Sequence, residues 1–245
     1  MSQATTHRTA SRTPAAKKSS GTSARKGQIQ SRPKSLTDKA YSKIEELIVT
    51  LELAPGAAIS ESELSTYLGI GRTPVREALQ RLAWEHLVYI IPQRGILVSE
   101  IDIKRQLRLL ETRREIERLV VKSAARRATA GEIAEFQKLT KRFERAAKTG
   151  DYESFIRADK EFNDLSLRAA RNEFSAAAMG LMHGLSRRFW FMHHQQADDI
   201  EVMAKLHGAL SKAIAGRNEQ LAAQALDELI DHIEAFTMTT VSTDY

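Results

Sequence analysis

The segment Ser60–Val98 constrains the fold more than any other part of the sequence, because two short helix signals are followed by two short strand signals. Its first residues have the Ser-x-x-Glu form of a capping box, which predicts a helix start with Leu64 and Leu68 on the buried face. The glycines of the run Gly69–Gly71 then end this helix. The pattern therefore predicts a tight turn between two helices.

A second helix is predicted to begin with Thr73 as the N-cap and Pro74 in the first helical position, and to continue to about His86. Its buried face carries apolar residues at helical spacing, namely Val75, Leu79 and Leu82. Polar residues recur every fourth position on another face, namely Arg72, Arg76 and Gln80. Arginine can bond guanine, glutamine can bond adenine, and a helix N-terminus attracts phosphate, so this face suits a DNA major groove.

Two apolar, β-branched runs follow the second helix. Val88–Ile91 and Ile96–Val98 are separated by Pro92–Gly95, which predicts a small hairpin with Arg94 at its tip. Upstream, apolar residues at helical spacing predict a helix over residues 36–51 that ends before Pro55. Three helices and a small β-wing are therefore expected.

The ordered run from Glu61 to Leu79, followed by Arg94 and Gly95, resembles the winged helix-turn-helix of GntR-family transcription regulators. This resemblance implies DNA contacts from the two motif helices and the wing, through Ser62, Arg72, Thr73, Pro74, Arg76, Arg94 and Gly95. The family often has serine or threonine in place of Gly71, so a hydroxyl contact to phosphate is missing here. The alternative is that these arginines are only solvent-exposed charges on a helix face and do not contact DNA.

The length of 245 residues allows two domains, and we expect a winged helix over residues 36–100 followed by a second domain over residues 101–240 and a tail over 241–245. The sequence has no cysteine and no apolar run of transmembrane length, which excludes a disulfide framework and predicts no membrane partner. The simplest expected location is a reducing cytoplasm.

Residues 1–35 account for the net positive charge of the chain, because they contain eight Lys and Arg and no Asp or Glu. Such a segment cannot bury enough apolar surface to fold alone, so a disordered tail is predicted. It would add sequence-independent affinity by neutralising DNA phosphates, or it is a solubilising or dispensable extension. An organellar transit peptide has a similar composition, but nothing else in the sequence supports one.

From Ile101 onward the pattern is helical, with predicted breaks near residues 129–131, 150–151, 171–172, 196–199 and 216–218. Proline is absent after Pro92, and alanine, leucine, glutamate and arginine dominate. The predicted fold class is therefore mainly α: a winged helix-turn-helix followed by an antiparallel α-helical bundle of six to seven helices.

Several polar residues of the bundle are candidate ligands. Asp159 and Asn163 are four residues apart and share a helix face, while His207 and His232 lie on the last two helices. A lone histidine on an amphipathic helix is more often a partly buried, hydrogen-bonded residue than a ligand.

A GntR winged helix followed by a helical domain is similar to the FadR-like branch, whose C-terminal FCD domain binds a small effector. Many members hold a divalent metal, zinc or a similar ion, with an Asp-x-x-x-His pair and two later histidines. The resemblance places Asp159 at the aspartate, Asn163 at the first histidine and His207 at the second. The last histidine is expected at Leu229, and His232 lies one turn further on, which makes it a marginal ligand. A weak metal site and a metal-free pocket both remain open.

The resemblance also implies an effector site that includes Arg113, Asp159, Asn163 and His207, and the aromatic and basic run over residues 187–191 adds Trp190 as a candidate lining residue. Arg113 would bind a carboxylate through paired hydrogen bonds, or it forms a surface salt bridge with Glu117. Trp190 would form a pocket wall, or it is simply part of the core.

Together these features predict a homodimeric repressor that binds a roughly palindromic double-stranded DNA operator and responds to a small organic-acid effector. An architectural DNA-coating protein that uses the basic tail is the first alternative. A metal-dependent enzyme using Asp159, Asn163 and His207 is the second, but no convincing base or nucleophile accompanies these residues, so we expect no enzyme.

Overall fold

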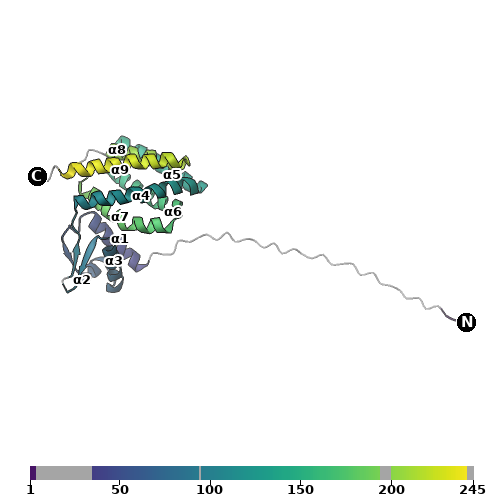
Figure 1. Ribbon diagram of the computed structural model, residues 1–245. Helices are drawn as coiled ribbons and strands as arrows, with labels where there is room; N and C mark the ends of the chain where they lie inside the picture. The colour runs from purple at the N-terminus through teal and green to yellow at the C-terminus, as the bar shows by residue number, and fades with distance from the viewer. Residues whose placement is uncertain (4–34, 94, 194–199, 242–245) are drawn as a thin grey trace. The chain divides into compact units, whose positions relative to one another are not determined.

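The computed structural model describes residues 1–3, 35–93, 95–193 and 200–241 (Figure 1). Almost all of the predicted basic tail, Arg94, the predicted break at residues 196–199 and residues 242–245 lie outside the described residues, so their predicted properties stay predictions. The described elements, in chain order, are α1 Leu36–Val49, β1 Ala58–Ile59, α2 Glu61–Leu68, α3 Arg72–Trp84, β2 Val88–Ile91, β3 Gly95–Val98, α4 Ile103–Arg127, α5 Ala130–Thr149, α6 Tyr152–Ala170, α7 Glu173–His193, α8 Ile200–Ala215 and α9 Glu219–Val241.

Helices α1, α2 and α3 pack with a three-stranded antiparallel sheet of order β1-β3-β2. Three residues of α1 spaced four positions apart, Ala40, Ile44 and Ile48, are fully buried because they share one helix face. The sequence did not predict β1. With only two residues, it shows no alternating pattern, and its pairing with β3 depends on the rest of the fold.

The helix starts of the motif agree only in part with the prediction. Ser60 is the N-cap of α2, and its hydroxyl accepts a hydrogen bond from the Glu63 amide at 3.1 Å. The predicted start of α3 at Thr73 is wrong, because Gly71 is the N-cap and helical geometry begins at Arg72. Pro74 is therefore the third helical residue, which its missing N–H allows, since the first amides of a helix have no intrahelical acceptor.

Helices α4–α9 form the second part of the described structure, and α4 and α9 lie side by side (Figure 1). Its core contains a cluster of aromatic rings, in which Phe162 lies edge-on to Phe136 and Phe143 at centroid distances of 5.9 and 6.1 Å. The predicted fold class is confirmed: a winged helix-turn-helix is followed by a helical bundle.

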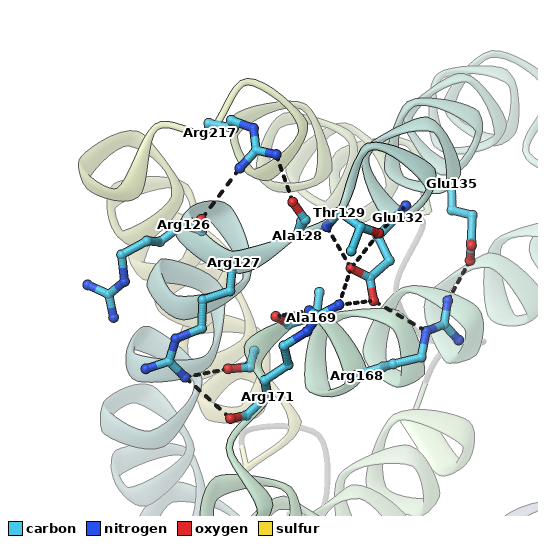
Figure 2. A network of polar contacts seen from close by, with 11 residues as sticks. Arg126, Arg127, Ala128, Thr129, Glu132, Glu135, Arg168, Ala169, Arg171 and Arg217 are labelled. Carbon is cyan, nitrogen blue, oxygen red and sulfur yellow. Dashed lines mark hydrogen bonds and ion pairs between the residues drawn. The ribbon is translucent and has the colours of Figure 1, made fainter. Parts of the chain in front are cut away.

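Arginine side chains join the helix ends at the turn between α4 and α5 (Figure 2). Arg127 donates to the Ala170 carbonyl oxygen at 2.6 Å, and Arg217 donates to the Ala128 carbonyl oxygen at 2.7 Å. These carbonyls belong to or directly follow the last residues of α6 and α4, where helices lack intrahelical donors. The arginines therefore complete the hydrogen bonding of the helix ends.

Glu132 lies at the centre of this network and is only 7 % exposed. Its carboxylate accepts from the Thr129 amide at 2.8 Å, completing a capping box, and from Arg171 Nη2 at 2.8 Å. Burial alone would raise the pKa of Glu132, but the bonds from Thr129 and Arg171 offset it and leave the pKa lowered.

We expect Glu132→Gln to lower the free energy of unfolding by about 2 kcal/mol, because Arg171 loses its charged partner and the capping box is weakened. A lowered folded-state pKa stabilises the native state above the unfolded-state value of about 4.3 and less so as pH falls through the folded-state pKa. The difference between wild type and variant should therefore shrink in acid. Chemical denaturation at pH 7 and pH 3 measures both effects.

Glu135→Gln is the matched control, because Glu135 also bonds an arginine of α6, Arg168, but the side chain is 53 % exposed. Exposed ion pairs contribute at most about 1 kcal/mol. Equal losses for the two variants would contradict the role assigned to Glu132.

Candidate functional site

The exposed face of α3 carries the residues that the sequence selected for DNA contact. Arg72, Thr73, Arg76 and Gln80 are exposed, and Pro74 is half-buried. The N-cap residue Gly71 makes no side-chain cap hydrogen bond, so a bound anion could reach the first amides of α3. Ser62 is exposed on α2, whose C-cap Gly69 has φ of 63° and allows the tight turn into α3.

Arg76 forms an ion pair that the sequence did not predict. Its Nε lies 3.0 Å and its Nη2 lies 2.8 Å from Glu61 Oε2 on α2. More than half of the arginine side chain remains exposed. The hydrogen bond from Arg76 lowers the pKa of Glu61. The two residues are on different helices, so no periodic pattern in the sequence could indicate the pair. Glu61 holds the guanidinium at the exposed face.

The wing is formed by β2 and β3, in which Ile91 pairs with Gly95. Gly95 has φ of 99°, a conformation that disfavours any side chain, so the strand can start here only with glycine. Arg94 precedes it and lies outside the described residues. The structure therefore places one of the two predicted wing residues.

A second site is a cavity of about 180 Å³ lined by residues of α1, α4, α6, α7, α8 and α9. Most of its wall is apolar and includes Phe155, Phe162, Leu210, Leu226, Leu229 and Phe236. The five predicted effector residues, Arg113, Asp159, Asn163, Trp190 and His207, all line it. Residues on four different helices are therefore brought together around one space.

Arg113 is only 9 % exposed, so it is not part of a surface salt bridge. It does pair with Glu117, with Nε 2.6 Å from Oε1, but this pair is buried at the cavity. Its Nη1 donates to the Ser186 hydroxyl at 2.8 Å. These bonds orient the guanidinium and leave other N–H donors for a ligand.

Asp159 of α6 lines the same cavity and accepts hydrogen bonds from two neighbouring side chains. Asn163 Nδ2 lies 3.1 Å from Asp159 Oδ1, and His207 Nε2 lies 3.1 Å from the same oxygen. The other ring nitrogen of His207, Nδ1, is 2.8 Å from the Met203 carbonyl oxygen. Both ring nitrogens thus lie within hydrogen-bonding distance of an oxygen. Burial raises the pKa of Asp159, but the bond from His207 and the charge of Arg113 offset it and leave the pKa lowered.

Sequence reasoning missed several polar residues that line the cavity, among them Glu117 as a cavity residue, Ser166, His183 and Ser186. His183 lies four and seven residues before Arg187 and Trp190, so helical spacing within α7 could have indicated it. Burial lowers the pKa of His183. The Ser166 hydroxyl is buried without a hydrogen-bond partner among the described residues.

Trp190 is both a wall residue and part of the core packing. Its indole ring lies 5.0 Å from the Phe236 ring, centroid to centroid, and is tilted by 57°. The indole also faces the Tyr152 hydroxyl, whose pKa burial raises to about 12. The two predicted roles of Trp190 are thus not exclusive.

The residues at Asp159 do not fit a tightly held metal ion. A structural zinc site takes four protein ligands, whereas Asp159 and His207 bond each other and Asn163 offers only an amide. Leu229 lines the cavity where the last histidine was expected, and the lining residues do not include His232. Among the described residues, no cluster of three or more His, Cys, Asp or Glu could hold a metal.

Comparison with known proteins identifies both parts of the chain. Residues 36–98 match the gntR family of bacterial regulatory proteins, and residues 108–232, more than half of the chain, match the FCD domain. The chain belongs to the GntR family. The gntR family is a family of regulatory proteins, and the relatives of this chain are named as transcriptional regulators, in agreement with the prediction of a regulator rather than an enzyme.

Three relatives illustrate the similarity. A transcriptional regulator from an unstable DNA locus of Streptomyces ambofaciens is 52% identical over 65 residues, covering 26% of this chain and 28% of that protein. McbR of Escherichia coli is 35% identical over 111 residues, 45% of this chain and 50% of McbR. The repressor RspR of Escherichia coli is 25% identical over 186 residues, 76% of this chain and 82% of RspR. The matches to the first two relatives thus span half of their length or less.

The solved structure of Escherichia coli McbR superposes with a TM-score of 0.72 at 21% identity, covering 85% of this chain and 100% of McbR. At this identity the likeness shows the fold alone. Within the described part of this GntR protein, no helix has both the length and the apolar character needed to cross a membrane.

Proposed function

We propose that this GntR protein is a sequence-specific, DNA-binding transcription repressor whose operator affinity changes when a small carboxylated metabolite occupies the bundle cavity. The protein would act as a homodimer on a roughly palindromic operator in the cytoplasm. Its DNA-binding domain would comprise residues 36–100 and its effector domain residues 101–240. The exposed basic face of α3 is the observation that carries this proposal.

DNA contact is assigned to residues on α2, α3 and the wing, namely Ser62, Arg72, Thr73, Pro74, Arg76, Gln80, Arg94 and Gly95. Arg72 is exposed at the start of α3 beside amides without a side-chain cap, which suits a phosphate. Arg76 and Gln80 follow on the same face at the spacing that reaches successive base edges. Glu61 holds the Arg76 side chain in place, which reduces the entropy lost on binding.

Effector contact is assigned to Arg113, Asp159, Asn163, Trp190 and His207. Arg113 is buried and oriented by two partners, so a ligand carboxylate would meet a prearranged guanidinium. The partnerless hydroxyl of Ser166 would supply one more polar contact. The aromatic and leucine wall would cover an apolar ligand body. Since the metal ligand set does not fit, no metal is part of this proposal.

The repressor role rests on family resemblance and on the similarity to RspR, which is a transcriptional repressor. Dimerisation would place two α3 helices in successive major grooves, as expected for a palindromic operator. A DNA-binding titration tests the proposal. The purified full-length chain is titrated against its own upstream region and a scrambled duplex of equal length, with and without a panel of organic acids.

A strong preference for one palindromic segment, changed by one of the acids, is the expected result. Equal binding to both duplexes would contradict the proposed function and favour the architectural alternative, for which the eight Lys and Arg of residues 1–35 are the supporting observation. The same titration on a chain that starts at residue 35 then separates these two. A coating protein loses most of its affinity, whereas a specific regulator keeps its preference.

A further inference from the structure

Helix α7 has one face at the cavity and another at the winged helix. His183, Ser186, Arg187 and Trp190 line the cavity at the spacing of a single helix face. Gly184, Leu185 and Arg188 instead contact the winged helix and the segment that follows it. The two faces belong to one rigid helix, so neither can move far without the other.

Arg188 makes the most unusual of these contacts, because it is only 2 % exposed and has no carboxylate partner among the described residues. Its Nη1 donates to the Ser99 carbonyl oxygen at 2.8 Å, and its Nη2 donates to the Ser99 hydroxyl at 2.9 Å. Ser99 in turn donates to the His86 carbonyl oxygen at 2.8 Å, just after α3 ends. Hydrogen bonds from Arg188 thus join α7 to Ser99, and the Ser99 hydroxyl in turn bonds the segment just after α3.

This contact is costly to form. A buried cation without a carboxylate partner loses hydration that backbone oxygens replace only in part. The Arg188 Nε is buried without a hydrogen-bond partner among the described residues. Burial and the charge of Arg105 lower the pKa of Arg188 to about 10. The contact between Arg188 and Ser99 is therefore one that a small displacement of α7 can break.

Two further contacts accompany Arg188. At Gly184 an added Cβ would lie 2.7 Å from Leu87 Cδ1, so the helix and the winged-helix core touch at this point. Arg187 Nη1 lies 3.2 Å from Glu45 Oε1 on α1. Arg187 also lines the cavity, as do the α1 residues Glu46 and Val49. An anion in the cavity would therefore compete with Glu45 for Arg187.

We propose that α7 couples occupancy of the cavity to the placement of the winged helix, with Arg188 and Gly184 as the coupling positions. This regulation rests on the proposed function. A ligand that displaces Arg187 from Glu45 shifts α7, and the Arg188–Ser99 contact transmits the shift to the segment after α3. Ligand and operator thereby favour different placements of the same helix.

The test needs no ligand, because coupling is reciprocal and can be measured from the winged-helix side. Trp84→Phe leaves Trp190, at the cavity, as the only tryptophan of the full-length chain. Arg188→Gln and Gly184→Ala are introduced into this parent, and Arg145→Gln, an exposed arginine of α5, is the matched control. Acrylamide quenching of Trp190 reports the cavity, and hydrogen exchange of residues 85–93 reports the winged helix.

We expect Arg188→Gln to raise exchange in residues 85–93 by about tenfold and Trp190 quenching by about twofold, with no change in the control. Faster exchange with unchanged quenching in the folded variants would overturn the proposal, and so would no change in either readout. If circular dichroism shows that Arg188→Gln is unfolded, the same two readouts on Gly184→Ala decide the proposal, because this variant adds only a single methyl group. The proposed function is tested separately, by titrating the Trp84→Phe parent with operator DNA. If the parent shows no preference for the operator, the proposed function is wrong, but the comparison of Trp190 quenching still tests the coupling.

Discussion

Arg76→Ala is expected to weaken operator binding by about 10- to 100-fold, because one bidentate arginine–base contact contributes roughly 1–3 kcal/mol of discrimination. Binding to a scrambled duplex should fall only about twofold, since one lost charge changes the nonspecific term little. The melting temperature should stay the same, because the ion pair with Glu61 is at the surface. Fluorescence anisotropy with both duplexes at a fixed salt concentration measures the two affinities.

Two matched variants make this result specific. Lys43→Ala removes one exposed charge from α1, outside the α3 face, and should leave operator preference unchanged. Glu61→Gln keeps Arg76 but weakens the bond that holds it, so it should cost less than Arg76→Ala. An equal loss for Arg76→Ala and Lys43→Ala would mean that only net charge matters, and the architectural alternative would then be correct.

Asp159→Ala is expected to lower the free energy of unfolding by about 3 kcal/mol, because it leaves the buried His207 ring and the half-buried Asn163 amide without their shared acceptor. For a chain of this size the melting temperature should fall by about 10 °C. Chemical and thermal denaturation monitored by circular dichroism measure both values. Removing half of a buried pair is costly, although the intact pair itself contributes little net stability.

Asp164→Ala is the matched control, because Asp164 is an exposed aspartate on the same helix. Its loss should change stability by less than about 0.5 kcal/mol. Asp159→Asn separates charge from hydrogen bonding, since the amide oxygen still accepts but carries no charge. Equal effects of Asp159→Ala and Asp164→Ala would show that the contact with His207 does not stabilise the bundle.

Local sequence signals predicted the winged helix well, because its elements are specified by nearby residues. The N-cap Ser60, the C-cap Gly69 and the β-branched runs of the wing each act within a few positions. The start of α3 was placed two residues late because Thr73 is a better side-chain cap than Gly71, but backbone geometry at the tight turn decided the start. The strand β1 was missed because its pairing depends on a distant strand.

The cavity was predicted less completely. The five predicted effector residues do line it, but resemblance supplied most of them. The sequence suggests Glu117 only as a surface partner of Arg113, because no local pattern shows that the pair is buried. His183 and Ser186 fall on a helix whose face toward the cavity depends on how α7 packs against α4 and α6. Sequence periodicity gives the faces of a helix, but not what each face contacts.

Sequence alone determined the class of this protein, since the order of helix caps, glycines, arginines and wing strands is local and needs no tertiary contact to be recognised. Tertiary structure alone decided which charges are surface groups and which are buried. Arg188 has no local signal that distinguishes it from the adjacent Arg187, yet it lies fully buried on the carbonyls of Ser99 and Glu100. Burial depends on elements distant in sequence, and for this reason only the folded chain shows the contact between α7, which lines the cavity, and Ser99, which follows the wing strand β3.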